Sequence, residues 1–382
     1  MKIGLVCPYN IAKGGGVQEI VRAMQQELAK RGHTAIILTP EPRDMSEYHR
    51  KDDIIFVGGA ADFKSPLHTT SQFSVAADTY GITQMLEEEK FDILHFHEPW
   101  VPMLSRQILS RSKAVNIATF HAKLPETLMT RTMARVVTPY TKAVLKQLHE
   151  LTAVSEAASE YVRTLTDEPV SIIPNGIDLS LYKNVPHKTV KKEQIKTILY
   201  IGRLERRKGV SCLLEAYGLL EERVSDVQLI VAGDGPDREK LENMADDLNI
   251  RNITFLGYVT EEEKVTLLAE ADLFCAPSLY GESFGIVLLE AMATGVVTVA
   301  GNNPGYASVL QELGSLSLVN PKDYEQFARR LDVMLHDEGL RKLWKKWAKA
   351  YVQQYHYPKI VDQYIEVYDA ATKRHATSLE SV

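Results

Sequence analysis

The chain has 382 residues, of which 45% are hydrophobic and 25% are charged. This composition is ordinary for a globular protein, and the length allows two domains with a core each. The formal net charge of −6 at pH 7 excludes a general nucleic-acid-binding protein, which needs a basic surface.

The three cysteines, Cys7, Cys212 and Cys275, lie far apart within apolar stretches. Their spacing fits neither a disulfide framework nor a metal site and is typical of reduced core residues. The apolar run Ile3–Cys7 is too short for a signal peptide, and no apolar stretch is long enough to span a bilayer. We therefore expect a cytoplasmic protein without a transmembrane helix.

Short apolar runs alternate with amphipathic helical patterns, such as Val17–Arg31, along the chain. The first series of expected strands is Ile3–Cys7, Ala35–Leu38, Ile54–Val57, Ile93–Phe96, Val115–Thr119, Leu151–Val154 and Ser171–Ile173. The second series is Thr197–Ile201, Val227–Ala232, Ile253–Leu256, Leu273–Ala276, Val296–Ala300 and Leu316–Val319. Near-continuous Ile, Val and Leu strands between helices predict α/β architecture with parallel sheets that are covered on both faces.

Two series of strands predict two doubly wound domains. The segment Pro174–Asp178 closes the first series, and the polar segment Lys183–Lys196 separates it from the second. We expect an N-terminal domain of residues 1–178 and a C-terminal domain of residues 195–356. Because doubly wound sheets bind ligands outside the carboxyl ends of their strands, we expect the substrate in a cleft between the two domains.

Two glutamates, Glu282 and Glu290, flank the start of a predicted helix. The first backbone N–H groups of a helix lack internal partners and can hold a phosphate. At helical rise the two carboxylates are about 12 Å apart, too far for a glycosidase pair, which needs about 5–9.5 Å. This spacing suits two sugars at the ends of a diphosphate, with Glu282 on the transferred sugar and Glu290 on the ribose. The alternative is a solvated surface helix, which the apolar run Ile286–Leu289 disfavours.

This segment, Glu-Ser-Phe-Gly-Ile-Val-Leu-Leu-Glu-Ala at residues 282–291, resembles the Glu-x7-Glu motif of family 4 retaining glycosyltransferases. It is most similar to that of bacterial phosphatidylinositol mannosyltransferases. The resemblance implies the GT-B fold of two Rossmann-like domains and transfer of mannose from GDP-mannose to a hydroxyl acceptor, with no cofactor. It also implies that Trp347–Ala371 belongs to a helical tail that crosses back, so that residues 357–382 join the N-terminal domain.

A glycine-rich loop, Gly14–Gly16, follows the first expected strand. Consecutive glycines let the backbone approach a phosphate at a helix N-terminus, although a simple tight turn is the alternative. The loop fits neither a dinucleotide fingerprint nor a Walker motif. In the resembling enzymes, the equivalent of Gly16 contacts the donor diphosphate and that of Gln18 faces the acceptor. Lys13 departs from the acidic or small residue found there, so the identity of the acceptor stays open.

A basic loop follows the first strand of the second domain. Arg203 and Lys208 match the family and can neutralise a departing nucleotide diphosphate. We interpret Arg206 and Arg207 as a solvated basic turn. The chain has no Asp-x-Asp motif, so we expect no metal to be required.

The resemblance assigns further donor contacts in the second domain. Val259 and Lys264 border the nucleotide base. The backbone from Phe284 through Gly285 to Ile286 stabilises the leaving diphosphate.

Three histidines could support a different chemistry. His95 and His97 lie on one side of an expected strand end, Glu98 follows them, and His121 ends the next strand. Such residues could ligate zinc in a hydrolase, but no His-Glu-x-x-His motif accompanies them. The resemblance instead places His121 at the reacting centre, on the sugar and acceptor side. A sugar-nucleotide epimerase of the same architecture is a further alternative.

The acceptor is the least constrained part of the prediction. The segment Arg131–Lys146 has the pattern of a basic amphipathic helix, which either lies on an anionic membrane at the cytoplasmic face or packs as an ordinary helix. A membrane lipid or glycolipid acceptor and a soluble acceptor with a UDP-sugar donor are both consistent with the sequence.

Overall fold

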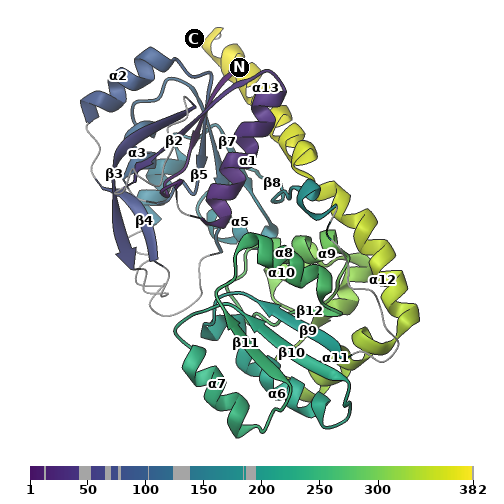
Figure 1. Cartoon of the computed structure of the whole chain (residues 1–382). Helices are drawn as coiled ribbons and strands as arrows, with labels where there is room; N and C mark the ends of the chain where they lie inside the picture. The colour runs from purple at the N-terminus through teal and green to yellow at the C-terminus, as the bar shows by residue number, and fades with distance from the viewer. Residues whose placement is uncertain are drawn as a thin grey trace. The chain divides into compact units, whose positions relative to one another are not determined.

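The computed structural model describes residues 1–12, 14–42, 53–64, 70–75, 79–101, 103–123, 138–183, 185 and 195–380. The chain forms two compact units (Figure 1). Unit 1 comprises Met1–Gly176 and Tyr357–Val382, and unit 2 comprises Ile177–His356. Each unit is built around one sheet.

Within the described residues, the sheet of unit 1 has eight strands in the order β4-β3-β2-β1-β5-β6-β7-β8. The strands are β1 (Lys2–Val6), β2 (Thr34–Glu41), β3 (Ile54–Lys64), β4 (Thr70–Val75), β5 (Ile93–His97), β6 (Val115–Phe120), β7 (Glu150–Ala153) and β8 (Val170–Ile172). All neighbours are parallel except β3 and β4, so the expectation of a wholly parallel sheet is wrong at this edge. The five residues between β3 and β4 are too few for a crossover, which takes a dozen or more.

The strand order places a topological switch point between β1 and β5. β1 pairs with β2 on one side and with β5 on the other. Right-handed crossovers that leave in opposite directions put their helices on opposite faces, and a crevice opens at the carboxyl ends of the two strands. The glycine-rich loop follows β1 and His97 ends β5, so the fold brings these two predicted features to the same edge.

The helices of unit 1 are α1 (Gly16–Lys30), α2 (Thr79–Glu89), α3 (Leu104–Leu109), α5 (Glu156–Arg163) and α13 (Tyr357–Glu380), and residues 138–145 are also helical. The C-terminal helix α13 packs beside α1 and contacts β6 (Figure 1). An ion pair of 2.7 Å between Arg31 and Asp362 joins the two helices. The tail belongs to unit 1 from Tyr357 onward, whereas residues 347–356, which the expected helical tail included, belong to unit 2.

The sheet of unit 2 has six parallel strands in the order β11-β10-β9-β12-β13-β14. They are β9 (Lys196–Ile201), β10 (Val227–Ala232), β11 (Ile253–Gly257), β12 (Leu273–Ala276), β13 (Val297–Gly301) and β14 (Leu318–Val319). The strand expected over Leu316–Val319 is too long, because a 3-10 helix occupies Glu312–Ser317. The switch point here lies between β9 and β12.

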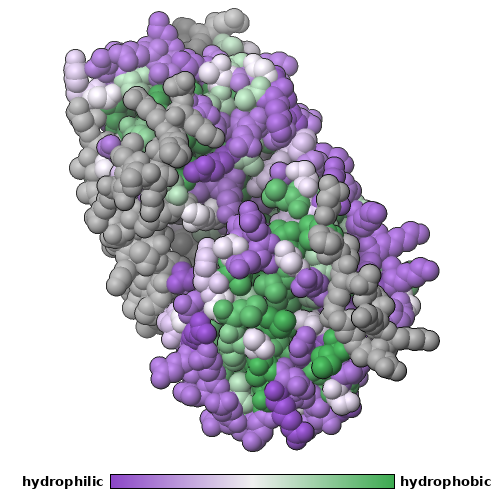
Figure 2. Space-filling view, viewed as in Figure 1, coloured by the Kyte–Doolittle hydropathy of each residue, from purple (hydrophilic) through white to green (hydrophobic). Residues whose placement is uncertain are grey.

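Helices cover this sheet on both faces. They are α6 (Val210–Glu221), α7 (Arg238–Asp247), α8 (Glu261–Glu270), α9 (Ile286–Thr294), α10 (Pro304–Val309), α11 (Tyr324–His336) and α12 (Glu338–Tyr351). Hydrophilic residues dominate the visible surface of both units, and hydrophobic ones gather over the edge strand β11 (Figure 2). The three cysteines are buried and unpaired, as predicted. Burial raises the pKa of the Cys7 thiol to about 12, so this thiol is inert.

Candidate active site

Two loops meet at the switch point of unit 2. The loop after β9 carries Arg203 and the 3-10 turn Arg206–Lys208, and the loop after β12 carries Glu282. The backbone N–H of Leu279 donates to the carbonyl of Arg207 at 2.8 Å. Gly209 permits this approach, because it has φ +71° and a Cβ there would lie 2.2 Å from a carbonyl oxygen. The close backbone contact sets the basic turn beside Glu282.

Glu282 is the centre of an ion cluster. Its Oε1 atom lies 2.7 Å from Nζ of Lys208 and 3.1 Å from Nη1 of Arg207. Burial raises the pKa of the Glu282 carboxyl, but the two cations and the Ser278 hydroxyl outweigh burial and hold that pKa below its ordinary value. The carboxylate is therefore ionised and acts only as a hydrogen-bond acceptor.

The interpretation of Arg207 as solvated is wrong. Its side chain is only 27% exposed, and it forms a second ion pair of 2.7 Å with the carboxylate of Glu205. The turn at Gly209 folds Arg207 back toward the β12 loop, so its guanidinium lies between two carboxylates. Arg203, in contrast, is exposed. Its carbonyl accepts the hydroxyl of Tyr200 at 2.9 Å, which holds the start of the basic loop on the end of β9.

The N-terminus of α9 has no side-chain cap. Gly285 precedes the helix with φ +111°, and a Cβ there would lie 2.6 Å from the ring of Tyr306. The N-cap residue thus supplies no side-chain acceptor to the first N–H groups of α9, an arrangement that favours an anion. The helix starts at Ile286, so Glu282 lies outside it and the axial distance calculated from helical rise does not apply. Phe284 is buried beneath this turn.

Glu290 lies inside α9 and pairs with a lysine from α8. Its Oε1 atom is 2.7 Å from Nζ of Lys264, and both side chains are largely buried. Burial raises the pKa of Glu290, although Lys264 and the Tyr182 hydroxyl oppose the increase. The alternative interpretation of this segment as a solvated surface helix is therefore wrong. Val259, after β11, is half-buried.

In unit 1 the glycine-rich loop leads directly into α1. Gly15 is the N-cap residue, and α1 has no side-chain cap either. Gln18 lies in the first turn, and its Nε2 atom reaches the carbonyl of Asn10 at 3.5 Å. Gly16, the first helical residue, is exposed. Lys13 lies outside the described residues.

The histidines form a buried chain at the carboxyl ends of β5 and β6. Nδ1 of His97 is 2.9 Å from Nε2 of His121. The rings of His95 and His97 are tilted by 31° with centroids 4.4 Å apart, which confirms that both face one side. Glu98 accepts the backbone N–H of His121 and thereby fixes the turn after β6. Burial lowers the pKa of His95 and of His121 to about 3, so both imidazoles are neutral.

The zinc-hydrolase alternative has no support in this geometry. The two ring nitrogens of His95 already bind the hydroxyls of Tyr368 and Thr119, at 2.7 and 2.6 Å. His97 and His121 bind each other. Within the described ranges, no group of three or more His, Cys, Asp or Glu side chains could hold a metal ion.

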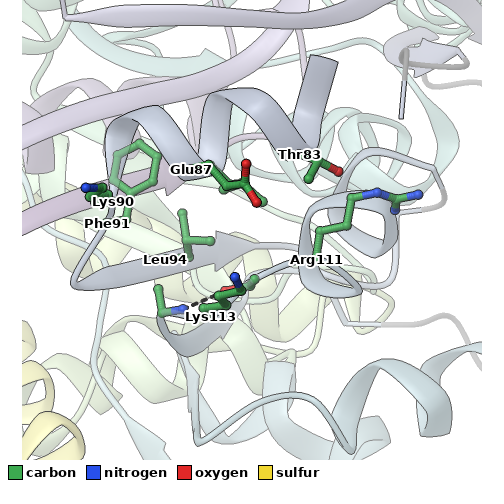
Figure 3. Close-up of a pocket in the computed structure, with 10 residues that line it drawn as sticks. Thr83, Glu87, Lys90, Phe91, Leu94, Arg111 and Lys113 are labelled. Atoms are coloured by element: carbon green, nitrogen blue, oxygen red, sulfur yellow. Dashed lines mark hydrogen bonds between the residues drawn. The ribbon is translucent and has the colours of Figure 1, made fainter. Parts of the chain in front are cut away.

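A cavity of about 590 Å³ in unit 1 lies away from these residues. It opens at the amino ends of β5 and β6, where Thr83 and Glu87 of α2 face Leu94 of β5 (Figure 3). Its lining is Thr83, Leu86, Glu87, Lys90, Phe91, Leu94, Arg111, Ser112, Lys113 and Ala114. It contains no predicted site residue and is at the opposite end of the strands from His97.

The basic segment Arg131–Lys146 is described only from residue 138 onward. In that part Val144 and Leu145 are buried and Lys142 and Lys146 are exposed. The described portion is thus an ordinary packed helix, and its apolar face is not available to a membrane. No helix in the part of the chain that the structure describes is long and apolar enough to cross a bilayer.

Sequence reasoning missed several residues of these clusters. The sequence could have pointed to Arg207, because this residue is adjacent to Lys208 in a loop already assigned to phosphate binding. No sequence pattern pointed to Ser278 or Tyr306. Their hydroxyls come from separate segments, lie 3.0 Å apart and brace the Glu282 loop. Asn175, which interacts with His121, lies in the segment Pro174–Asp178, which was interpreted only as the end of the first series of strands.

Comparison with known proteins covers almost the whole chain. Residues 14–181 match the model described as Glycosyltransferase Family 4, and residues 183–351 match Glycosyl transferases group 1. The chain is 32% identical over 379 residues to a phosphatidyl-myo-inositol mannosyltransferase from Mycolicibacterium smegmatis, which covers 97% of this chain and 94% of that protein.

Two solved structures share the fold. A glycosyltransferase from Rickettsia africae has a TM-score of 0.75 at 19% identity, covering 97% of this chain and 98% of that one. HepE from Anabaena, in complex with UDP and glucose, has a TM-score of 0.74 at 17% identity, covering 97% and 100%. The expected GT-B fold of two Rossmann-like domains is thereby confirmed.

Proposed function

Because this chain belongs to glycosyltransferase family 4 and is a glycosyltransferase, we propose that it transfers mannose from GDP-mannose to a hydroxyl group of a membrane lipid or glycolipid. One observation carries the choice of sugar: the 32% identity to a phosphatidyl-myo-inositol mannosyltransferase extends over 97% of the chain. The ion cluster around Glu282 supports a nucleotide-sugar donor in unit 2.

The donor lies along the carboxyl ends of the unit 2 strands in this proposal. Arg203, Lys208 and the uncapped N-terminus of α9 stabilise the diphosphate. Glu282 accepts hydroxyls of the mannose, and Glu290 accepts those of the ribose. Val259 and Lys264 border the base. Support comes from the placement of Arg203, Lys208 and Glu282 after the adjacent strands β9 and β12, at the switch point.

The acceptor is held by unit 1, by Gln18 and His121, and the backbone at Gly16 contacts the donor diphosphate. The acceptor oxygen bonds to the anomeric carbon on the face from which the diphosphate departs. The carbon–oxygen bond to the diphosphate breaks, and a phosphate oxygen takes the acceptor's proton. Configuration at the anomeric carbon is thus retained without a covalent enzyme intermediate. The cations and helix dipole stabilise the charge on the leaving group in place of a metal ion.

We further propose that the protein works at the cytoplasmic face of the membrane as a peripheral protein. Lys142, in the helical residues 138–145, and Lys146, directly after them, are exposed and offer positive charge to anionic headgroups. The attraction is electrostatic, because the apolar residues of this helix are buried, and it should weaken as salt concentration rises.

The test is transfer by the purified protein. Radiolabelled GDP-mannose is supplied with vesicles that contain phosphatidylinositol, with vesicles that lack it, and with soluble glycosides, each with and without a chelator. Labelled mannose on a lipid product, unaffected by the chelator, is the expected outcome. The alternative of a UDP-sugar donor is tested with UDP-glucose, since the HepE structure contains UDP and glucose. Transfer from UDP-glucose alone, or activity abolished by chelation and restored by metal, would overturn the proposal.

A further inference from the structure

A second cavity of unit 1, of about 760 Å³, contains no predicted contact with the donor or the acceptor. It lies at the amino ends of β7 and β8, where Glu150 begins β7 and Pro169 precedes β8. His121 follows the carboxyl end of β6, so the cavity is at the opposite edge of the sheet. Its volume is typical of a small-molecule site, which occupies about 300–1,000 Å³.

Two lysines line one side of this cavity. The backbone N–H of Lys146 donates to the carbonyl of Lys142 at 3.4 Å, so the helical turn of residues 138–145 continues through Lys146. Residues four apart lie on one face of a helix, and two like charges at this spacing repel each other. Both side chains are exposed, and neither has an ion pair within the described ranges. An anion between the two ammonium groups would relieve their repulsion.

The C-terminal helix α13 brings a third cation to the cavity. Arg374 and Ala371 are three positions apart on α13, and both line the cavity. Nη2 of Arg374 donates to Oε1 of Glu150, which holds the guanidinium at the start of β7. A guanidinium has five N–H donors, so this one bond leaves others for a ligand. Because Glu150 is paired with Arg374, Glu168 is the lining carboxylate that opposes the two lysines.

His149 adds a neutral donor. The backbone N–H of Asn116 donates to Nδ1 of His149 at 2.9 Å, and a backbone N–H can only donate. Nδ1 is therefore unprotonated, and the neutral ring carries its proton on Nε2. The backbone N–H of His149 donates to the carbonyl of Asn116 at 2.7 Å, and the ring of His375 packs edge-on with centroids 4.8 Å apart. His149 is exposed and lines the cavity, so its ring can offer this N–H to a ligand there.

Apolar side chains complete the lining, and they are Leu145, Leu148, Leu165 and Ala371. The cavity thus combines cations with an apolar wall. Ammonium and guanidinium groups form short, charge-assisted hydrogen bonds with phosphate oxygens. The apolar wall gains by covering hydrocarbon. This combination suits an anion that carries an organic group, because a bare anion would leave the leucines in contact with water.

We propose that this cavity binds a phosphate ester. Lys142, Lys146 and Arg374 bind the phosphate oxygens, and the leucines pack against the organic part. A lipid headgroup and a soluble phosphate ester share this chemistry, and the apolar wall favours the lipid. The lipid source rests on the proposed function, in which the protein works at a membrane. The phosphate site itself rests only on contacts within unit 1.

Two probes distinguish the sources. Dihexanoyl phosphatidic acid and glycerol 3-phosphate carry the same glycerol phosphate and differ only in two short acyl chains. Calorimetric titration measures the affinity of each probe for the wild type, for Lys142→Gln/Lys146→Gln and for the control Lys342→Gln/Lys346→Gln. The control removes two exposed lysines, also four positions apart, from α12 of unit 2. Both double variants therefore have the same net charge.

The wild type and the control should bind dihexanoyl phosphatidic acid equally well, and Lys142→Gln/Lys146→Gln should bind it about 10- to 100-fold more weakly. Weaker binding of glycerol 3-phosphate assigns the site to a lipid, whereas equal binding supports a site for a soluble ester. Binding of neither probe, or equal losses in the two double variants, would overturn the proposal. A protein that binds either probe through these lysines but transfers no mannose refutes the proposed function alone. Transfer of mannose by a protein that binds neither probe refutes the phosphate site alone.

Discussion

The substitution Glu282→Gln should separate sugar recognition from nucleotide recognition in the donor site. Glutamine keeps the shape of the side chain and removes its charge. If the carboxylate accepts mannose hydroxyls, its loss removes a charged hydrogen bond worth about 1.5–3 kcal/mol. That energy corresponds to a decrease in kcat/KM of about 10- to 150-fold.

Affinity for GDP should respond differently. In the structure Oε1 of Glu282 binds both Lys208 and Arg207. A diphosphate that binds Lys208 must compete with this carboxylate. Glu282→Gln weakens the competitor, so affinity for GDP should stay the same or increase. The fold should tolerate the change, since the amide oxygen can still accept from Lys208 and the close backbone contact of the loops is untouched.

Calorimetric titration with GDP and with GDP-mannose measures these effects, alongside the rate of transfer. Glu290→Gln is the matched control, because it makes the same chemical change eight residues further along the chain. It should weaken binding of GDP itself, through the lost ribose contact. Equal losses of GDP affinity in the two variants, or normal transfer by Glu282→Gln, would refute the assignment of the two glutamates.

Three further predictions follow from the geometry. Arg203→Ala and Lys208→Ala should each lower kcat/KM by an amount equivalent to about 2–4 kcal/mol, while circular dichroism shows a folded protein. Lys264→Met should lower the stability of unit 2 by about 3 kcal/mol, because the buried carboxylate of Glu290 loses its partner. Thermal unfolding measures this loss, and adding Glu290→Gln should restore most of the lost stability. Burial raises the pKa of Glu98 from 4.5 to about 7, so the folded state binds this proton more tightly than the unfolded chain does. The stability that protonated Glu98 contributes to the fold is present below pH 4.5 and is lost as pH rises to 7. Urea unfolding of the wild type should show this decline in stability, and Glu98→Gln should lack it.

Most of the fold could be predicted because its parallel strands are short runs of Ile, Val and Leu with no need for polar alternation. The proximity of Lys208 and Glu282 also follows from sequence, once β9 and β12 are recognised as the two sides of a switch point. The edge strand β4 could not be placed, because antiparallel pairing there depends on the short connection and not on strand composition. The start of α9 depends on Gly285, where a side chain would clash with the ring of Tyr306 twenty-one positions later.

The histidines show a different limit of sequence reasoning. Alternation along a strand correctly places His95 and His97 on one side, since the period of a strand is fixed by its backbone. Whether three such rings bind a metal or each other depends on partners from elsewhere in the chain. Tyr368 lies 273 positions from His95, and its hydroxyl occupies a nitrogen that a metal site would need. No local pattern could reveal that contact.

Glu282, in the loop before α9, and Glu290, inside α9, show how the environment of a carboxyl group sets its pKa. Both are largely buried, and burial raises the pKa of each carboxyl. Two cations reverse the effect at Glu282, whereas one lysine fails to do so at Glu290. Glu282 therefore stays a charged acceptor that balances the charges of Lys208 and Arg207. In the proposed donor complex, a diphosphate that binds Lys208 frees lone pairs of Glu282 for the sugar hydroxyls, and this proposal therefore couples recognition of the phosphate to recognition of the sugar through a single oxygen atom.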